Sequence, residues 1–234
     1  PSSSPSSTSS SIRHDAEVIG LVGLAHGTSH FFHLMLPPLF PWLMKDFDLS
    51  YTEAGLLMTT FFVISGIGQA LAGFIVDKVG SRPVLFFGMG LLALSGVVLG
   101  MSNSYAMLLM TAAVAGLGNS IFHPADFTLL NRRVAQPRLG HAFSVHGLSG
   151  NLGWAAAPVF MAGIATFAGW QAAGFAAASV GAAVLAILFL RRSMLASAAA
   201  ELVVPSHAQV AAVKGAAANQ FAFLRSTPVW LCFA

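Results

Sequence analysis

The chain has 234 residues, of which 56% are hydrophobic and only 8% are charged, and its formal net charge is +3. Soluble globular domains carry about 25% charged residues, so the composition excludes a water-facing surface of ordinary polarity, and the small charge gives no support for nucleic-acid binding. The single cysteine, Cys232, excludes an intrachain disulfide and a thiolate metal site. We therefore predict an all-α membrane protein that crosses the bilayer several times.

Residues 1–17 begin with a low-complexity run of serine and proline. Such a run is too polar to order by itself, so we predict a disordered cytoplasmic tail. The apolar stretch that follows is long and contains histidine, and no short apolar core with a small-residue cleavage site is present. A signal peptide is therefore not expected.

Six apolar stretches have the length of a helical span, which needs about 20 residues. They cover residues 18–44, 54–76, 83–102, 105–131, 141–168 and 170–190. Residues 191–227 are more polar and rich in alanine and serine, which predicts a cytoplasmic connector. A further apolar run covers residues 228–234. We predict six transmembrane helices over 18–190, the connector, and the start of a seventh helix.

Basic residues gather on one side of these spans. Lys45 is the only one of the 11 that falls on the other side, beside Asp46, Asp48 and Glu53. The remainder are Arg13, Lys78, Arg82, Arg132, Arg133, Arg138, Arg191, Arg192, Lys214 and Arg225. Because cytoplasmic loops carry the excess of lysine and arginine, this side is predicted to be cytoplasmic, together with the N-terminus.

The link between the second and third stretches reads GFIVDKVGSRPVL. Gly73 predicts a close approach to a neighbouring helix, and Gly80 permits a tight reversal. Asp77 is an anion at a helix end, where it can accept a hydrogen bond from Arg82. With Lys78, these residues resemble the cytoplasmic loop signature of the major facilitator superfamily, G-x-x-x-D-[RK]-x-G-x-[RK]-[RKP].

This resemblance implies an architecture and a partner. Members of the superfamily have twelve spans in two six-span halves, and each half is a pair of inverted three-helix repeats. The chain would be the amino-terminal half, in the bacterial inner membrane, and the missing carboxy-terminal half would supply the other wall of the substrate path. The loop Gly73, Asp77, Lys78, Gly80 and Arg82 would lock the cytoplasmic side between states. The half alone is not expected to transport.

Two further stretches, GLGNSIFHPADF in the fourth span and LPPLFPWL at the end of the first, resemble the fosmidomycin-resistance group of bacterial drug exporters. This resemblance implies proton-driven export of a small, drug-like molecule. One position departs from the group, because His30 stands where many of its members carry an acid.

Histidines are concentrated in the predicted spans. His26, His30 and His33 follow an i, i+4, i+7 spacing, so they share one stripe of a helix that is otherwise apolar. Such a stripe points to protein or to a water-filled cavity rather than to lipid. At a rise of about 1.5 Å per residue, His26, His123 and His146 lie at one level in the cytoplasmic half of the membrane. His30 and His33 lie deeper, and Asp126 lies nearer the cytoplasmic mouth.

The residues expected to line the substrate and proton cavity are His26, His30, His33, His123, Asp126, His146, Asn119, Asn151 and Gln69. An imidazole, with an unperturbed pKa near 6.5, changes charge at physiological pH, so these groups suit a proton relay. The alternative for each histidine, and for Gln69, Asn119 and Asn151, is a hydrogen bond that fixes helix packing. For Asp126 the alternative is a salt bridge to Arg132 or Arg133.

Other functions remain as alternatives at this stage. A proton-coupled importer of a small organic acid would use the same residues, and a transporter half could also have no activity of its own. The spacing His26-x3-His30-x2-His33 could suit a metal, but the adjacent histidine pair of membrane di-iron enzymes is missing. We therefore expect no metal, no cofactor and no enzymatic activity, with a small molecule, protons and the lipid bilayer as partners.

Overall fold

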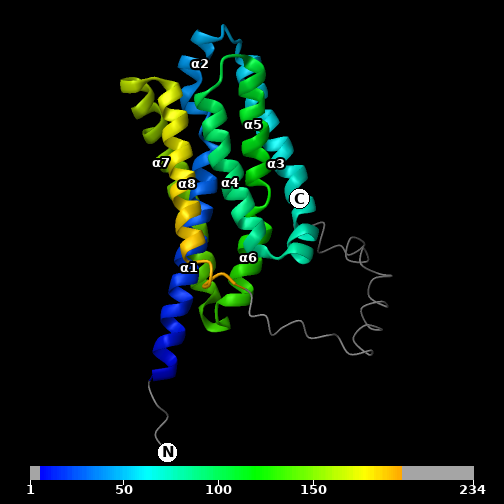
Figure 1. Cartoon of the computed structure of the whole chain (residues 1–234), viewed down its shortest axis with the longest axis vertical. Coiled ribbons are helices and arrows are strands. Elements are labelled where there is room, and N and C mark those ends of the chain that lie inside the picture. The colour runs from blue at the N-terminus through cyan, green and yellow to red at the C-terminus, as the bar shows by residue number, and fades with distance from the viewer. Residues whose placement is uncertain (1–5, 197–234) are drawn as a thin grey trace, which may run out of the picture. The chain divides into compact units, whose positions relative to one another are not determined.

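The computed structural model describes residues 6–196, in which every regular element is a helix. The long helices run side by side along one axis (Figure 1). In chain order the elements are α1 (Ser6–His33), the 3-10 helix η1 (Pro37–Leu39), α2 (Phe40–Asp46), α3 (Tyr51–Val79), α4 (Ser81–Gly100), α5 (Tyr105–Asn119), α6 (Phe122–Arg133), the 3-10 helix η2 (Gln136–Arg138), α7 (Leu139–Ala168) and α8 (Trp170–Leu190). Within the described residues, five segments are long and apolar enough to cross a membrane: 51–79, 81–100, 105–133, 136–168 and 170–190.

The first predicted span, residues 18–44, is divided into α1, η1 and α2. α1 ends at His33 because the residue four positions later, Pro37, has no N–H to donate to the carbonyl of His33. Pro38 and Pro41 continue the interruption in the same way. This histidine-bearing segment is not one of the five that meet the length and hydropathy criterion.

The fourth predicted span, residues 105–131, is also divided, into α5 and α6. The interruption falls at Ser120 and Ile121, where the proline effect recurs: Pro124 cannot donate to the carbonyl of Ser120. Pro158 behaves differently, because α7 continues through it. The α5–α6 break sets the direction in which the side chains of α6 project.

The start of the chain differs from the predicted tail over residues 1–17, because α1 is already helical at Ser6. Side-chain contacts hold the N-terminal end of α1, as described below. Residues 191–196, at the start of the predicted connector, form turns, and Leu195 is fully buried. The rest of the connector and the predicted seventh helix lie outside the described residues.

Helix packing is closest between α1 and α7. A Cβ atom added to Gly27 would lie 2.8 Å from the backbone oxygen of Ser149, and one added to Gly153 would collide with the backbone oxygen of Gly27. Only glycine allows two helix backbones to come this near. The other main pairs are α4 with α8, α4 with α5, and α3 with α5.

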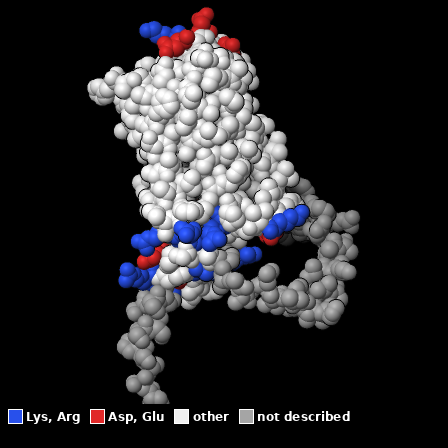
Figure 2. All heavy atoms as spheres, viewed as in Figure 1, with Lys and Arg blue, Asp and Glu red and all other residues white. Residues whose placement is uncertain are grey.

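On the face drawn in Figure 2, the described residues form an uncharged region between two charged ends. Many large hydrophobic side chains are exposed, among them Phe74 at 69% and Phe167 at 91%. Soluble monomers rarely expose apolar patches of this extent. The lower end in Figure 2 carries most of the lysine and arginine, and the upper end carries mainly acidic residues. The chain is therefore a multi-pass membrane protein.

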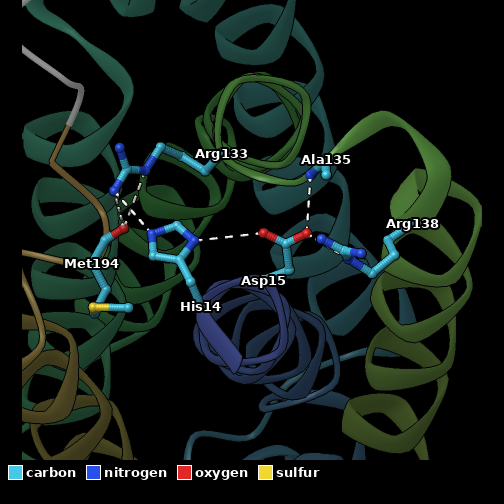
Figure 3. A network of polar contacts seen from close by, with 6 residues as sticks. All are labelled: His14, Asp15, Arg133, Ala135, Arg138 and Met194. Atoms are coloured by element: carbon cyan, nitrogen blue, oxygen red, sulfur yellow. Dashed lines mark hydrogen bonds and ion pairs between the residues drawn. The ribbon is translucent and has the colours of Figure 1, made fainter. Parts of the chain in front are cut away.

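A polar network at the basic end joins α1 to two distant parts of the chain (Figure 3). The carboxylate of Asp15 accepts hydrogen bonds from Arg138 at 2.6 Å and from the backbone N–H of Ala135 at 3.1 Å. Arg133 donates to the backbone oxygen of Met194 at 3.0 Å and lies 3.3 Å from His14 Nε2. The network thus holds α1 to the α6–α7 link and the residues after α8.

Burial by itself raises the pKa of Asp15, but the hydrogen bonds from Ala135 and Arg138 outweigh it and hold this pKa below its usual value. A carboxyl group whose pKa is lowered on folding stabilises the protein at any pH above its unfolded pKa. The stabilisation is lost only as the pH falls through the lower, folded value. At neutral pH the Asp15 contacts are therefore fully stabilising.

We expect Asp15→Asn to lower the stability of the helical unit by about 1–2 kcal/mol, because it weakens a nearly buried charge-assisted pair. Thermal unfolding of the detergent-solubilised protein would measure this as a lower midpoint at pH 7. The difference from wild type should shrink only below about pH 4. Arg13→Gln, which removes the exposed Arg13–Glu17 pair, is the matched control and should change little. Equal effects of the two variants would contradict a stabilising role for the Asp15–Arg138 pair.

Candidate functional site

Four imidazoles from three helices meet in the interior. His26 and His30 come from α1, His123 from α6 and His146 from α7. The ring centroid of His26 lies 3.5 Å from that of His146, 4.3 Å from that of His30 and 5.1 Å from that of His123. Helical spacing brings the α1 pair to one face, and the break before α6 turns His123 toward it. The structure thus brings together the three residues that the depth estimate placed at one level.

Asp126 lies within this cluster and is fully buried. Its Oδ2 is 3.2 Å from His26 Nδ1 and 3.3 Å from His146 Nε2. The alternative partner Arg133 is instead bonded to Met194. The carboxylate of Asp126 reaches these rings because helical side chains lean toward the N-terminus of their helix, which here is the direction of His123.

Several polar atoms of the cluster are buried and have no hydrogen-bond partner within the described residues. They are both ring nitrogens of His30, His26 Nδ1 and Asp126 Oδ1. The carboxylate of Asp126 and the rings of His26 and His146 form one buried group of polar contacts that joins α1, α6 and α7.

His33 belongs to a different chain of hydrogen bonds, in which donors and acceptors can be assigned. The indole Nε1 of Trp154 donates to His33 Nδ1 at 3.2 Å. Because an indole N–H is only a donor, Nδ1 is unprotonated, and Nε2 donates to Asn119 Oδ1 at 2.6 Å. Asn119 Nδ2 then donates to Ser65 Oγ at 2.6 Å. The chain fixes His33 as one neutral tautomer and links α7, α1, α5 and α3.

Sequence reasoning assigned no role to Trp154 or Ser65. Trp154 lies about two helical turns beyond His146, and its ring centroid is 4.7 Å from that of His30. The helical spacing from His146 along α7 could therefore have predicted that Trp154 lies near the histidines. No sequence motif around Ser65 indicates its contact with Asn119. Gln69 is half-buried on α3 and Asn151 is exposed on α7, and neither joins the hydrogen-bonded cluster within residues 6–196. A cavity role for these two stays a prediction.

The predicted switch loop lies between α3 and α4. Gly80 has φ +93°, a backbone conformation that favours glycine, and makes the expected reversal. The close approach predicted at Gly73 is wrong for the described helices, because a Cβ there would meet nothing within 4 Å. Lys78 and Asp77 are exposed, and Arg82 lies 3.4 Å from the backbone oxygen of Arg192 rather than bonding to Asp77. The face of α3 that carries Gly73 is thus turned away from the other described helices.

Comparison with known proteins identifies the family. A family model described as Major Facilitator Superfamily matches residues 22–234. The chain belongs to the major facilitator superfamily. The resemblance carried by the loop between α3 and α4 is thereby confirmed.

Similar superfamily proteins include several named transporters. The chain is 30% identical to the fosmidomycin resistance protein of Escherichia coli (strain K12), over 62% of this chain and 36% of that protein. It is 27% identical to the uncharacterized MFS-type transporter YfnC of Bacillus subtilis (strain 168), over 62% and 35%. It is 25% identical to the probable nitrate transporter NarT of Staphylococcus epidermidis, over 58% and 35%. The matched parts thus cover about a third of these relatives' length.

The fold is similar to that of solved peptide transporters. A crystal structure of the peptide transporter POT in complex with sulfate has a TM-score of 0.69 at 18% identity, covering 88% of this chain and 45% of that one. A complex of POT with alafosfalin has a TM-score of 0.70, covering 92% and 46%. At this identity the likeness shows the fold alone, and the chain spans less than half of the transporter.

Proposed function

We propose that the chain is the amino-terminal half of a secondary active transporter in a bacterial inner membrane, which exports a small drug-like molecule in exchange for protons. The observation that carries the proposal is the fully buried Asp126, in contact with His26 and His146 and with no Arg or Lys partner among the described residues. A lone acid inside a transmembrane bundle is costly and is by default functional. Membership of a transporter superfamily supplies the context.

In this mechanism the coupled group of Asp126, His26 and His146 takes up and releases the driving proton. His30, whose buried ring nitrogens have no hydrogen-bond partner among the described residues, presents them to the substrate or to water that carries the proton. His123 is half-buried and gives access to the group. Proton uptake removes the negative charge of the group. This changes the relative free energies of the inward-facing and outward-facing states of the transporter, and so shifts the equilibrium between them.

The contacts between helices support two inverted three-helix repeats. The first repeat would be α1–α2, α3 and α4, and the second would be α5–α6, α7 and α8. If the two repeats are equivalent, the contact of α1 with α7 must have a counterpart between α5 and α3, and α4 must contact α8. All three pairs pack in this structure. We propose that a second half with the same arrangement forms the facing wall, that the loop at Gly80 switches between states, and that the basic end faces the cytoplasm with the N-terminus.

Export is supported by the 30% identity to a fosmidomycin resistance protein. Import of a small anion is the second candidate, because other relatives are named a probable nitrate transporter and a probable L-galactonate transporter, both for anions. Both directions use the same proton group. They differ in whether the substrate moves against or with the proton.

The test uses the full-length transporter that contains these helices, reconstituted in liposomes with an imposed pH gradient. Labelled substrate moving opposite to the proton supports export, and movement with the proton supports the importer. A transport rate that does not depend on the pH gradient overturns proton coupling for both the exporter and the importer. Liposomes holding only residues 1–234 are the control, and we expect no transport from them.

A further inference from the structure

We propose that His26, His123 and His146, with Asp126, form a binding site for a divalent transition-metal ion, Zn²⁺ in the first place. One ring nitrogen from each of the three histidines lies within 4.8 Å of the other two. The carboxylate Oδ2 of Asp126 lies against two of these rings. The same side chains include the proton group proposed above, so a bound ion would take the place of the proton, and the metal titration below tests the site without reference to transport.

The spacing of the donor atoms suits a tetrahedral ion. Zinc bonds of about 2.0–2.1 Å set neighbouring ligand atoms about 3.3 Å apart. Asp126 Oδ2 already lies 3.2 Å from His26 Nδ1 and 3.3 Å from His146 Nε2. One ring nitrogen from each of the three histidines lies within 4.8 Å of the others, and the rings of His26 and His146 are stacked at an interplanar angle of 22°, so ion binding requires these side chains to rotate.

Hydrogen-bond geometry gives a second, independent indication. His26 Nδ1 is close to the carboxylate but makes no hydrogen bond with it, and Asp126 Oδ1 has no hydrogen-bond partner in the described chain. These side chains are 2% and 0% exposed. Buried polar atoms without partners carry a free-energy cost, which coordination to a shared cation removes. A bound ion also compensates the buried carboxylate charge.

The chemistry of the donors selects the class of ion. Neutral imidazole nitrogens and one carboxylate oxygen are typical zinc ligands, and they also suit cobalt and nickel. The ligands come from α1, α6 and α7, so an ion would join three helices. Sequence spacing did not predict this site, because the pattern His26-x3-His30-x2-His33 lies within one helix, whereas the structure combines only its first member with α6 and α7.

The test measures metal binding by the purified chain of 234 residues in detergent. Calorimetric titration with Zn²⁺ is expected to show one saturable site, and Co²⁺ is expected to give the strong visible absorption of a four-coordinate ion. His123→Asn and Asp126→Asn each remove one ligand and should weaken binding about 100-fold or more. His141→Asn removes an exposed histidine of α7 and should leave the affinity within about twofold.

Circular dichroism and size-exclusion chromatography show which variants are folded, and only folded variants are compared. Asp126→Asn, a nearly isosteric change, decides the matter if His123→Asn does not fold. Absence of a saturable site in the wild-type chain overturns the proposal. It is equally overturned if His141→Asn weakens binding as much as the ligand variants do, because the ion would then bind surface histidines.

Discussion

Replacing Asp126 with asparagine is expected to abolish substrate accumulation driven by a pH gradient in the full-length transporter, reducing it to the level of protein-free liposomes. Asparagine keeps the size and a carbonyl oxygen for the contacts to His26 and His146, but it cannot take up and release a proton. The group would lose the acid that couples the two imidazoles. Gradient-driven uptake or efflux of labelled substrate measures the effect.

A second measurement separates coupling from folding. Exchange of labelled for unlabelled substrate without a gradient needs binding and access but no net proton movement, so it should persist in Asp126→Asn. His141→Asn is the control for loss of an ionisable group outside the cluster, because His141 is exposed. Gradient-driven transport that survives in Asp126→Asn would remove this residue from the mechanism. Loss of both activities in a folded variant would assign Asp126 to substrate binding instead.

Gly153→Val is expected to prevent α1 and α7 from packing. A Cβ at this position would collide with the backbone oxygen of Gly27, which cannot rotate away as a side chain can. The two helices must then separate, and overpacking of this kind costs about 3 kcal/mol or more. Because α1 carries His26 and α7 carries His146, separating the two helices would also move these histidines apart.

The matched control is Gly147→Val in the same helix, where the added atoms meet nothing within 4 Å. We expect Gly147→Val to give a monodisperse protein with an unchanged unfolding midpoint, and Gly153→Val to give aggregate or a much lower midpoint. Size-exclusion profiles and thermal unfolding in detergent provide the comparison. Similar midpoints for both variants would show that the α1–α7 contact is not the close approach described here.

Much of the fold could be predicted from the sequence, because hydropathy over about 20 residues and the sign of the flanking charges both report on the bilayer. The helix breaks were harder. Pro37 and Pro124 end helices, whereas Pro158 does not. Pro124 and Pro158 are both single prolines in apolar stretches, so tertiary packing decides whether a helix continues past the lost hydrogen bond.

The site was predictable to the extent that it depends on helix geometry. Spacing and depth brought His26, His123 and His146 to one level, since both follow from a fixed rise per residue. Contacts that depend on how helices approach one another were not predictable, among them Trp154 with His33 and Asp15 with Arg138.

The hydrogen bond from Trp154 to His33 has a consequence for how protons can travel. While the indole occupies Nδ1, this imidazole has no spare lone pair and cannot act as a base, so it interrupts any relay that continues beyond His30. A small slide of α7 that lengthened the 3.2 Å contact would free that lone pair. In the proposed transporter, the position of α7 relative to α1 would therefore decide whether His33 can accept a proton.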